Sequence, residues 1–345
     1  MPSYDHYVIL GNGPAGNNAA SFLRENDKDA KITIISDENI PFYYKPGLTR
    51  YITGDLAVSD LLVESLPSYR ERNIRLRLGQ IVDKIDPEQK IVFLRHKENV
   101  HYTKLVIASG SRARVLPSMR GYAQCLKHIT TYNEVMEFKD QIQAANDFFI
   151  FGGDLVGFKF IKMLGSMGKK VTLLIYPNAF WPFTLTHEMQ TTIASNLEKS
   201  GVEIIVGDDI HRIIEKENAY VVKTVKGMEK KVDMVFSFNG MIPSVDFAKG
   251  CGLDIDRGIL VNETMQTNVP DIYACGSCAQ IYNPDINSYT TSIGWPNAVV
   301  QGEVTAMNLL GDHKVIESAG RKYFDLEGVK IKTTWWEDIE ESSSI

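Results

Sequence analysis

The sequence lacks the features of several protein classes. Four cysteines in 345 residues are too few for a disulfide framework in a chain of this length. No stretch reaches the roughly 18 uninterrupted apolar residues that a membrane-spanning helix needs. The N-terminus also lacks a basic region followed by a long apolar core, so no signal peptide is visible. These absences predict a cytoplasmic protein with no membrane insertion.

The chain has only a small excess of acidic over basic residues. Acidic and basic residues are interspersed and the formal net charge is −6, which argues against nucleic acid as a partner. No cluster of histidine, cysteine and aspartate has metal-ligand spacing, so no metal is expected. His187, which precedes Glu188, lacks the second histidine of a zinc-binding helix and is expected at a surface or helix start.

The strongest positive signal is an apolar run, residues 7–10, that leads directly into the motif GNGPAG. Its glycines fit the G-x-G-x-x-G pattern of dinucleotide-binding turns. In that pattern Gly11 permits the tight turn, Gly13 lets the backbone approach a pyrophosphate, and Gly16 lets the helix pack close to the strand. A helix and a second strand at 31–35 would complete a βαβ unit. This context favours a dinucleotide site over a structural turn in an unrelated α/β protein.

Two acidic residues, Asp37 and Glu38, follow the second strand about twenty residues beyond the glycines, where a ribose-binding carboxylate belongs. Backbone N–H groups at the start of the intervening helix would face the phosphates, because a helix amino terminus favours negative charge.

A similar strand-turn-helix pattern begins at residue 148 and enters Gly152-Gly153-Asp154-Leu155-Val156-Gly157. Two such units indicate an internal duplication of dinucleotide-binding folds. In the second unit, however, Asp154 stands at the middle glycine position, where its carboxylate would repel a phosphate. Ile175 stands where the ribose-binding acid is expected.

Other segments suggest further elements. The aromatic and basic stretch 40–50 is expected to be a loop that either lines a cofactor or connects elements at the surface. Residues 74–100 alternate apolar and polar side chains, which favours antiparallel strands with a hairpin turn at 86–88. The length of the chain allows two domains, or three small ones.

Five segments in order carry a family resemblance: GNGPAG, SDENIPFYYKPGLTRYITG, LVIASGSRARVLP, TNVPDIYACGSCA and GWPNAVVQGEVTAMNLLG. Together they resemble the flavoprotein reductases of the pyridine nucleotide-disulfide oxidoreductase superfamily. The chain looks most similar to the branch that holds NAD(P)H:rubredoxin reductases, ferredoxin reductases of oxygenase systems and the flavin region of nitrite reductase large subunits.

The resemblance implies an α/β fold with two Rossmann-like domains in the three-layer ββα arrangement of glutathione reductase. It implies an FAD-binding domain of residues 1–113 and 240–325 and an NAD(P)-binding-like domain of residues 114–239. In place of the family's C-terminal interface domain, we expect a short acidic tail over residues 326–345. The tryptophans in that tail, Trp335 and Trp336, would either dock a partner or pack onto the FAD domain.

The resemblance also implies noncovalent FAD, with NADH or NADPH as a second nucleotide. The FAD contacts that it implies are Gly11, Gly13, Pro14, Ala15, Gly16, Asp37, Glu38, Lys45, Pro46, Arg50, Val82, Ala108, Ser109, Gly110, Arg112, Gly276, Ser277, Trp295 and Pro296. The second nucleotide would lie at Gly152, Gly153 and Gly157. Trp295 would flank the isoalloxazine ring or, alternatively, be ordinary core packing.

The chain departs from the family pattern at several functional positions. Ser277 stands where an aspartate usually bonds the ribityl chain, although a hydroxyl can still form a hydrogen bond. Lys159 replaces the glutamate that usually approaches the flavin. Arg50 and Lys159 are the predicted catalytic residues, since positive charge near the ring stabilises the anionic reduced flavin.

Two functions follow as expectations. The first is an FAD-dependent oxidoreductase that transfers electrons between NAD(P)H and a small redox protein such as rubredoxin or ferredoxin. The alternative is an FAD-binding electron-transfer subunit with a non-functional NAD site that docks in a larger redox complex. Disulfide reduction is disfavoured, because no cysteine lies in the 41–54 loop. Cys275 and Cys278 are expected to be small residues buried in the core rather than a redox couple.

Overall fold

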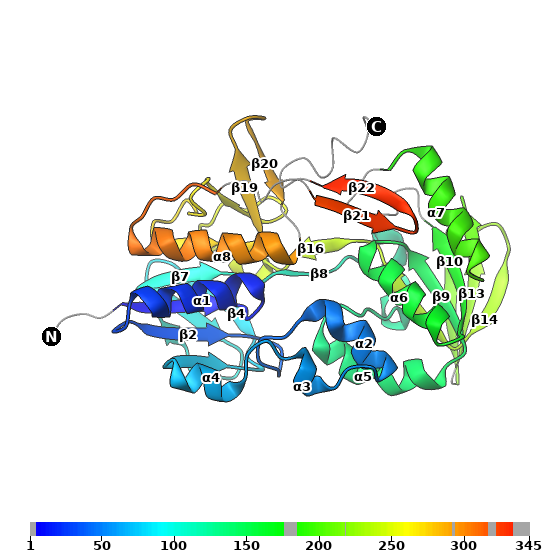
Figure 1. Ribbon diagram of the computed structural model, residues 1–345, viewed down its shortest axis with the longest axis horizontal. Coiled ribbons are helices and arrows are strands. Elements are labelled where there is room, and N and C mark those ends of the chain that lie inside the picture. Colours follow the sequence, from blue (N-terminus) through cyan, green and yellow to red (C-terminus); the bar gives the residue numbers. More distant parts are fainter. Residues whose placement is uncertain (1–4, 176–184, 218, 292–293, 317–321, 334–345) are drawn as a thin grey trace. The chain divides into compact units, whose positions relative to one another are not determined.

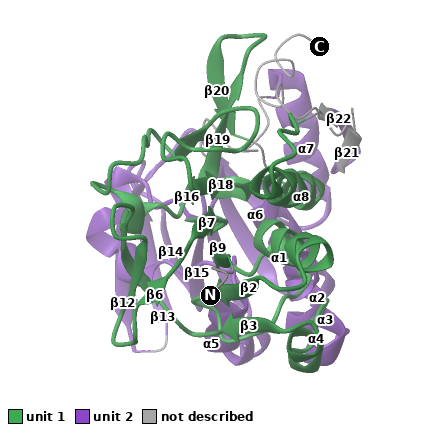
Figure 2. Cartoon of the chain, turned by 90° about the vertical axis from the view of Figure 1, so that its left-hand side faces the viewer, with its two compact units in different colours: residues 1–44, 62–112, 242–320 green, residues 45–61, 113–241, 321–345 purple. Residues whose placement is uncertain are grey.

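The computed structural model describes residues 5–175, 185–217, 219–291, 294–316 and 322–333. Figure 2 shows two compact units in different colours. Unit 1 comprises residues 1–44, 62–112 and 242–320, and unit 2 comprises residues 45–61, 113–241 and 321–345. The boundaries of the two cofactor domains stay a prediction.

Unit 1 is built on a five-stranded parallel sheet. Its strand order is β18-β7-β1-β2-β3, with β1 pairing to β2 in the register Tyr7↔Ile32 and to β7 in the register Tyr7↔Lys104. The strands are β1 (His6–Leu10), β2 (Lys31–Ile35), β3 (Ile74–Arg77), β7 (Lys104–Ile107) and β18 (Ile272–Ala274). The central strands are almost uninterrupted apolar runs, because both faces of the sheet are covered.

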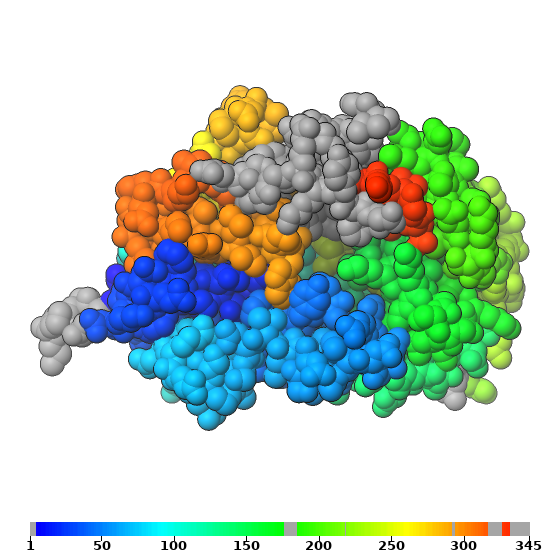
Figure 3. All heavy atoms as spheres, viewed as in Figure 1, coloured from blue at the N-terminus to red at the C-terminus, as the bar shows by residue number. Residues whose placement is uncertain are grey.

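Helices and a second sheet cover the two faces. Helices α1 (Pro14–Asn26), α4 (Leu66–Glu71) and α8 (Trp295–Leu310) lie on one side of the parallel sheet, and β6 (Val100–His101) lies on the other (Figure 2). Figures 1 and 3 show α1 in blue and α8 in orange side by side. Their backbones approach so closely that a Cβ on Gly302 would lie 2.1 Å from the carbonyl oxygen of Ala15.

The smaller sheets of unit 1 confirm one strand expectation and correct another. Strands β4 (Val82–Asp86), β5 (Ile91–Leu94) and β6 are antiparallel, and the predicted hairpin turn joins the first two. Strand β3 is parallel to β2 instead, so the antiparallel prediction was wrong for residues 74–77. Its alternating pattern reflects the edge position, where Ile74 is buried and Arg75 is exposed. Strands β17 (Ile259–Val261), β19 (Ala279–Asn283) and β20 (Ser288–Thr291) form a further sheet.

Unit 2 repeats the parallel strand-helix-strand design. Its four-stranded parallel sheet has the order β11-β10-β9-β15, and the antiparallel sheet β12-β13-β14 packs against it. The strands are β9 (Asp147–Gly152), β10 (Lys170–Ile175), β11 (Glu203–Val206), β12 (Ile210–Lys216), β13 (Ala219–Thr224), β14 (Glu229–Val232) and β15 (Met234–Phe238). The helices include α5 (Tyr132–Ala144), α6 (Leu155–Ser166) and α7 (His187–Lys199), so the exposed His187 begins a helix as expected.

The stretch 45–61 groups with unit 2. Lys45–Gly47 form a 3-10 turn that leads into α2 (Leu48–Thr53), followed by α3 (Val58–Leu61), so the expectation of a loop through residue 50 was wrong. Pro46 lies in the turn before α2 rather than inside it, which is where proline is tolerated. The Nε2 of Gln143 on α5 donates to the carbonyl of Ile52 at 2.7 Å, which fixes α2 on α5.

Two links and a hairpin complete the chain. Strands β8 (Ser111–Ala113) and β16 (Met241–Pro243) pair with each other where the chain passes between units. Strands β21 (Lys322–Leu326) and β22 (Val329–Thr333) form a hairpin in unit 2. The tail with Trp335 and Trp336 lies outside the described residues. None of the helices in the described ranges has the length and apolarity to cross a membrane.

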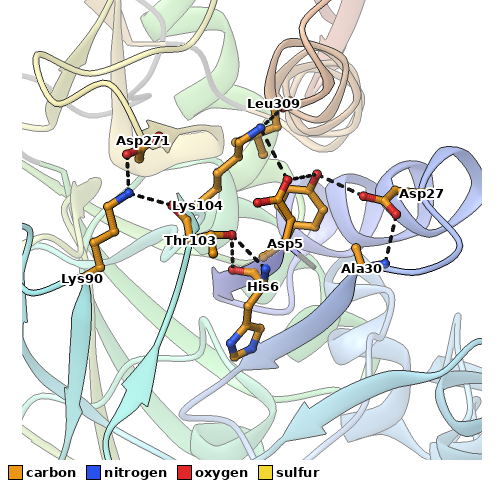
Figure 4. A network of polar contacts seen from close by, with 10 residues as sticks. Asp5, His6, Asp27, Ala30, Lys90, Thr103, Lys104, Asp271 and Leu309 are labelled. Carbon is orange, nitrogen blue, oxygen red and sulfur yellow. Dashed lines mark hydrogen bonds and ion pairs between the residues drawn. The ribbon is translucent and has the colours of Figure 1, made fainter. Parts of the chain in front are cut away.

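A polar network lies at the amino ends of the strands of unit 1, opposite the glycine-rich turn (Figure 4). The hydroxyl of Tyr7 donates to Asp27 at 3.3 Å, and the other oxygen of that carboxylate accepts the backbone N–H of Ala30 at 2.9 Å. The Nζ of Lys104 donates to the carbonyl of Leu309 at 2.6 Å. A cation at the carboxyl end of α8 complements the helix dipole, so the network fastens the helices to the sheet.

We expect Lys104→Met to lower the free energy of unfolding by about 1 kcal/mol, because it removes a charge-assisted hydrogen bond at the end of α8. Urea unfolding measures the change, with the exposed Lys97→Met as a matched control that should leave stability unchanged. Equal stability of the two variants would contradict the role assigned to Lys104.

Candidate functional site

A cavity of about 490 Å³ lies in unit 1 at the carboxyl ends of the central strands. Leu10 and Gly11 line it from the end of β1, and Ser36 and Asp37 line it from the end of β2. Val82 of β4 also lines the cavity, and its contact with an adenine stays a prediction. In open parallel sheets, ligands bind in crevices at this end of the strands.

The three glycines of the first turn have different surroundings. Gly11 has a φ of +109°, and a Cβ there would lie 2.1 Å from the carbonyl oxygen of Ala108. A Cβ on Gly16 would lie 2.1 Å from the carbonyl oxygen of Gly11. A Cβ on Gly13 would meet nothing within 4 Å. Gly11 and Gly16 are therefore required for packing, whereas Gly13 faces open space at the amino terminus of α1, beside Pro14 and Ala15.

The structure distinguishes the two candidate ribose acids. Asp37 lines the cavity, whereas the carboxylate of Glu38 accepts a hydrogen bond from the Tyr43 hydroxyl at 2.7 Å. Of the two carboxylates, Asp37 is therefore the better placed to meet a ligand in the cavity.

The segment after β7 closes the cavity. The hydroxyl of Ser109 donates to the carbonyl of Ser244 at 2.7 Å, and Gly110 has a φ of +69°. The guanidinium of Arg112 lies 2.6 Å from Asp246, and Lys249 and Arg112 together hold the pKa of that carboxyl below its usual range. The charge of Arg112 is thus already paired within the protein.

An aromatic cluster begins α8. The ring of Trp295 stacks on Phe42 with centroids 5.2 Å apart and an interplanar angle of 14°, and it meets Tyr44 edge-on at 5.3 Å. Pro296 follows in the first turn of the helix, where its missing N–H costs nothing. The structure thus shows Trp295 in an aromatic stack, and its contact with a flavin stays a prediction.

The glycine-serine pair of the third motif lies in a 3-10 turn, Gly276–Cys278. Gly276 has a φ of +74°, and its N–H donates to the side chain of Gln301 at 2.7 Å. Cys275 and Cys278 are fully buried free thiols, and burial raises the pKa of both. A raised thiol pKa opposes the thiolate that redox exchange needs, which favours the packing interpretation.

The residues of unit 1 fit a dinucleotide. The open space at Gly13 lies at a helix amino terminus, where backbone N–H groups favour an anion. The amide nitrogens of Asn12 and Gln301 are buried without a hydrogen-bond partner in the described part of the chain. Buried donors without partners are rare in native proteins, and an anionic cofactor could supply an acceptor.

The equivalent turn of unit 2 is occupied by a protein carboxylate. Asp154, 3% exposed, caps α6, and its two oxygens accept the N–H groups of Gly157 and Gly240, each at 2.9 Å. Burial raises the pKa of Asp154, and these hydrogen bonds oppose that shift. A Cβ on Gly152 would lie 2.0 Å from the carbonyl oxygen of Phe238, so this glycine is required for packing.

Several predicted residues lie in unit 2 rather than beside the cavity. Lys45, Pro46 and Arg50 belong to the segment 45–61, and Lys159 is exposed on α6. Gly153 and the buried Ile175 complete the second turn and strand. The roles of these residues toward a flavin or a second nucleotide stay predictions.

Sequence reasoning missed two residues that bond the first turn. Tyr69 and Asn17 form hydrogen bonds to Asn12, which stands between two motif glycines. The position of Asn12 was a signal that could have been used, whereas nothing in the sequence around Tyr69 indicated this contact.

Two parallel sheets, each with a glycine-rich turn leading into a helix, define a protein with two Rossmann-like domains. Residues 5–302 match the family model described as pyridine nucleotide-disulphide oxidoreductase, and the chain belongs to this family. The predicted fold class and family are therefore confirmed. Members of the family typically use FAD and NAD(P)H.

Three relatives illustrate the similarity. The chain is 28% identical over 307 residues to an NADH-rubredoxin oxidoreductase of Clostridium acetobutylicum, which covers 88% of this chain and 74% of the relative. It is 27% identical over 281 residues to an NAD(P)H nitrite reductase of Bacillus subtilis, covering 79% and 34% respectively. The crystal structure of the covalent putidaredoxin reductase-putidaredoxin complex matches with a TM-score of 0.86 at 26% identity, covering 97% of this chain and 82% of that chain.

We expect Gly13→Asp to retain the fold but lower FAD affinity on the order of 100-fold, because a carboxylate would cap α1 and repel the pyrophosphate. The variant would copy the arrangement seen at Asp154 in unit 2. The measurement is the flavin content of the purified protein, with Gly13→Ala as the uncharged control. A Gly13→Asp protein that purifies with full yellow colour would show that the pyrophosphate lies elsewhere.

Proposed function

We propose that this chain is an FAD-dependent oxidoreductase that transfers electrons between NAD(P)H and a small redox protein of the rubredoxin or ferredoxin type. The observation that carries the proposal is the unit 1 site, where Asp37 lines a cavity at the carboxyl ends of β1 and β2 and Gly13 leaves open space at the start of α1. Similarity to an NADH-rubredoxin oxidoreductase and to putidaredoxin reductase supports the class of partner.

Bound FAD would supply the hydride and electron chemistry, and the protein would hold it and set its electrostatics. Gly11, Gly13 and Gly16 would hold the pyrophosphate, Asp37 the ribose and the backbone of Val82 the adenine. Ser277 would take the place of the carboxylate that bonds the ribityl chain.

Arg50 and Lys159 would raise the flavin potential, because positive charge near the ring stabilises its anionic reduced form. Both side chains are exposed.

A second candidate function is favoured by Asp154. Its carboxylate accepts the N–H of Gly157 in the first turn of α6, which a dinucleotide phosphate would use, and the N–H of Gly240 after β15. With Ile175 in place of a ribose acid, unit 2 would bind NAD(P)H weakly. The chain would then be an FAD-binding electron-transfer subunit with a non-functional NAD site that docks in a larger redox complex.

The second candidate predicts that NADH and NADPH reduce the bound flavin slowly or not at all, because the Asp154 carboxylate repels the dinucleotide phosphates. Anaerobic mixing, followed at the flavin absorbance, measures the rate, and dithionite provides the fully reduced control. Complete bleaching within milliseconds would exclude the second candidate and leave the first.

We expect Asp154→Gly to increase the rate of flavin reduction by NADH by about tenfold or more, since it removes a buried negative charge from the turn. Asp154→Ser is the matched control, because serine can cap the helix without a negative charge. Its side chain still occupies part of the space that glycine would leave open. We expect flavin reduction to be fastest in Asp154→Gly, slower in Asp154→Ser and slowest in the protein that keeps Asp154. Identical rates for all three proteins would show that Asp154 is not the obstacle.

A further inference from the structure

Three separate segments of unit 1 meet at one buried hydroxyl. Tyr69 on α4 is 1% exposed, and its oxygen lies 2.6 Å from the Nδ2 of Asn17 on α1. The same oxygen lies 3.2 Å from the Oδ1 of Asn12, in the glycine-rich turn.

The chemistry of these groups sets the direction of each hydrogen bond. The Nδ2 of Asn17 can only donate, so the Tyr69 oxygen accepts from it and directs its single proton to the Oδ1 of Asn12. The Nδ2 of Asn17 also donates to the Oδ1 of Asn12 at 3.3 Å, which closes a triangle. Burial raises the pKa of Tyr69 to about 12, so the hydroxyl keeps its proton at physiological pH.

This triangle fixes the residue between Gly11 and Gly13. A glycine-rich turn loses much conformational freedom when it is ordered, and a turn that is ordered in advance binds its ligand more tightly. The Nδ2 of Asn12 is buried without a hydrogen-bond partner among the described residues. Because Oδ1 accepts two hydrogen bonds, the orientation of the Asn12 amide is settled.

Neighbouring residues hold Tyr69 itself in place. The guanidinium of Arg72 lies over the Tyr69 ring at 5.4 Å and donates to the Ser21 hydroxyl on α1 at 2.8 Å. Glu64 lies 3.2 Å from the same guanidinium. Helix α4 is therefore attached to α1 through Tyr69 and through Arg72.

We infer that Tyr69 is a positioning residue for the cofactor's pyrophosphate, acting through Asn12 on the turn from Gly11 to Gly16. This inference rests on the proposed function, because it requires a dinucleotide at that turn. Tyr69 touches no cofactor atom in this scheme; it preorganises the backbone that does.

The test uses apoprotein prepared from the purified flavoprotein and titrated with FAD, ADP and adenosine. Tyr69→Phe should raise the Kd for FAD and for ADP by about tenfold, the effect of losing one hydrogen bond of about 1.4 kcal/mol. The Kd for adenosine, which lacks the pyrophosphate, should stay unchanged. If Tyr69 had a purely structural role, its loss would raise the Kd for all three ligands by the same factor.

Tyr102→Phe is the matched control. Tyr102 is also buried in unit 1, but its hydroxyl has no hydrogen-bond partner in the described chain. Removing that hydroxyl should leave all three affinities unchanged.

Asn12→Ala keeps the test decisive if Tyr69→Phe folds poorly, and where both variants fold, the double variant measures their coupling. Asn12→Ala alone should raise the Kd for ADP by a similar factor. Adding Tyr69→Phe to this variant should raise that Kd little further. Unchanged ADP affinity in Tyr69→Phe, or equal losses for ADP and adenosine, would overturn this inference alone. Wild-type protein that binds neither FAD nor ADP would overturn the proposed function, and this inference with it.

Discussion

The N–H groups at the start of a helix that follows a parallel strand need acceptors, and both units are organised around this requirement. The first N–H groups of any helix have no partner within the helix. In unit 1 the turn before α1 is open at Gly13, so an anion from outside the chain can meet the requirement. In unit 2 the Asp154 carboxylate meets it from within. One backbone geometry therefore has two electrostatic outcomes, set by a single side chain.

The glycines that both turns share support this view. Gly11 and Gly152 each lie against the carbonyl oxygen at the end of a neighbouring strand, Ala108 in one unit and Phe238 in the other. Such contacts are required whether or not a nucleotide binds. A match to the glycine pattern therefore indicates the fold more strongly than it indicates a cofactor, and the middle position carries the functional information.

Much of the fold could be predicted because local signals agreed with the tertiary structure. The run at residues 7–10, the turn after it and the strand at 31–35 all appear in the structure as expected. The edge strand at residues 74–77 was misassigned, because an exposed edge of a parallel sheet gives the same alternation as an antiparallel strand. The start of helix α2 was missed because the predicted loop ran to residue 50, although proline at residue 46 is tolerated just before a helix.

The parts of the candidate site that depend on backbone conformation could be predicted from the sequence. The parts that depend on pairing between side chains could be predicted less well. Spacing alone predicted that Gly11 and Asp37 lie together at one end of the sheet, and both line the cavity. The pairing of Glu38 with Tyr43 and of Arg112 with Asp246 depends on residues distant in sequence or on rotamers that no pattern encodes. The contact of Tyr69 with Asn12 spans 57 residues and has no local signal.

The chain order of the units has a consequence for how the protein can change over time. Unit 1 is assembled from three separated segments, whereas most of unit 2 is one continuous block, residues 113–241. A continuous block can accumulate substitutions in its own turn without disturbing strand pairing in its host. The turn of the middle block can therefore differ from the turn of unit 1 without a change in the strands of unit 1, as Asp154 and Gly13 illustrate.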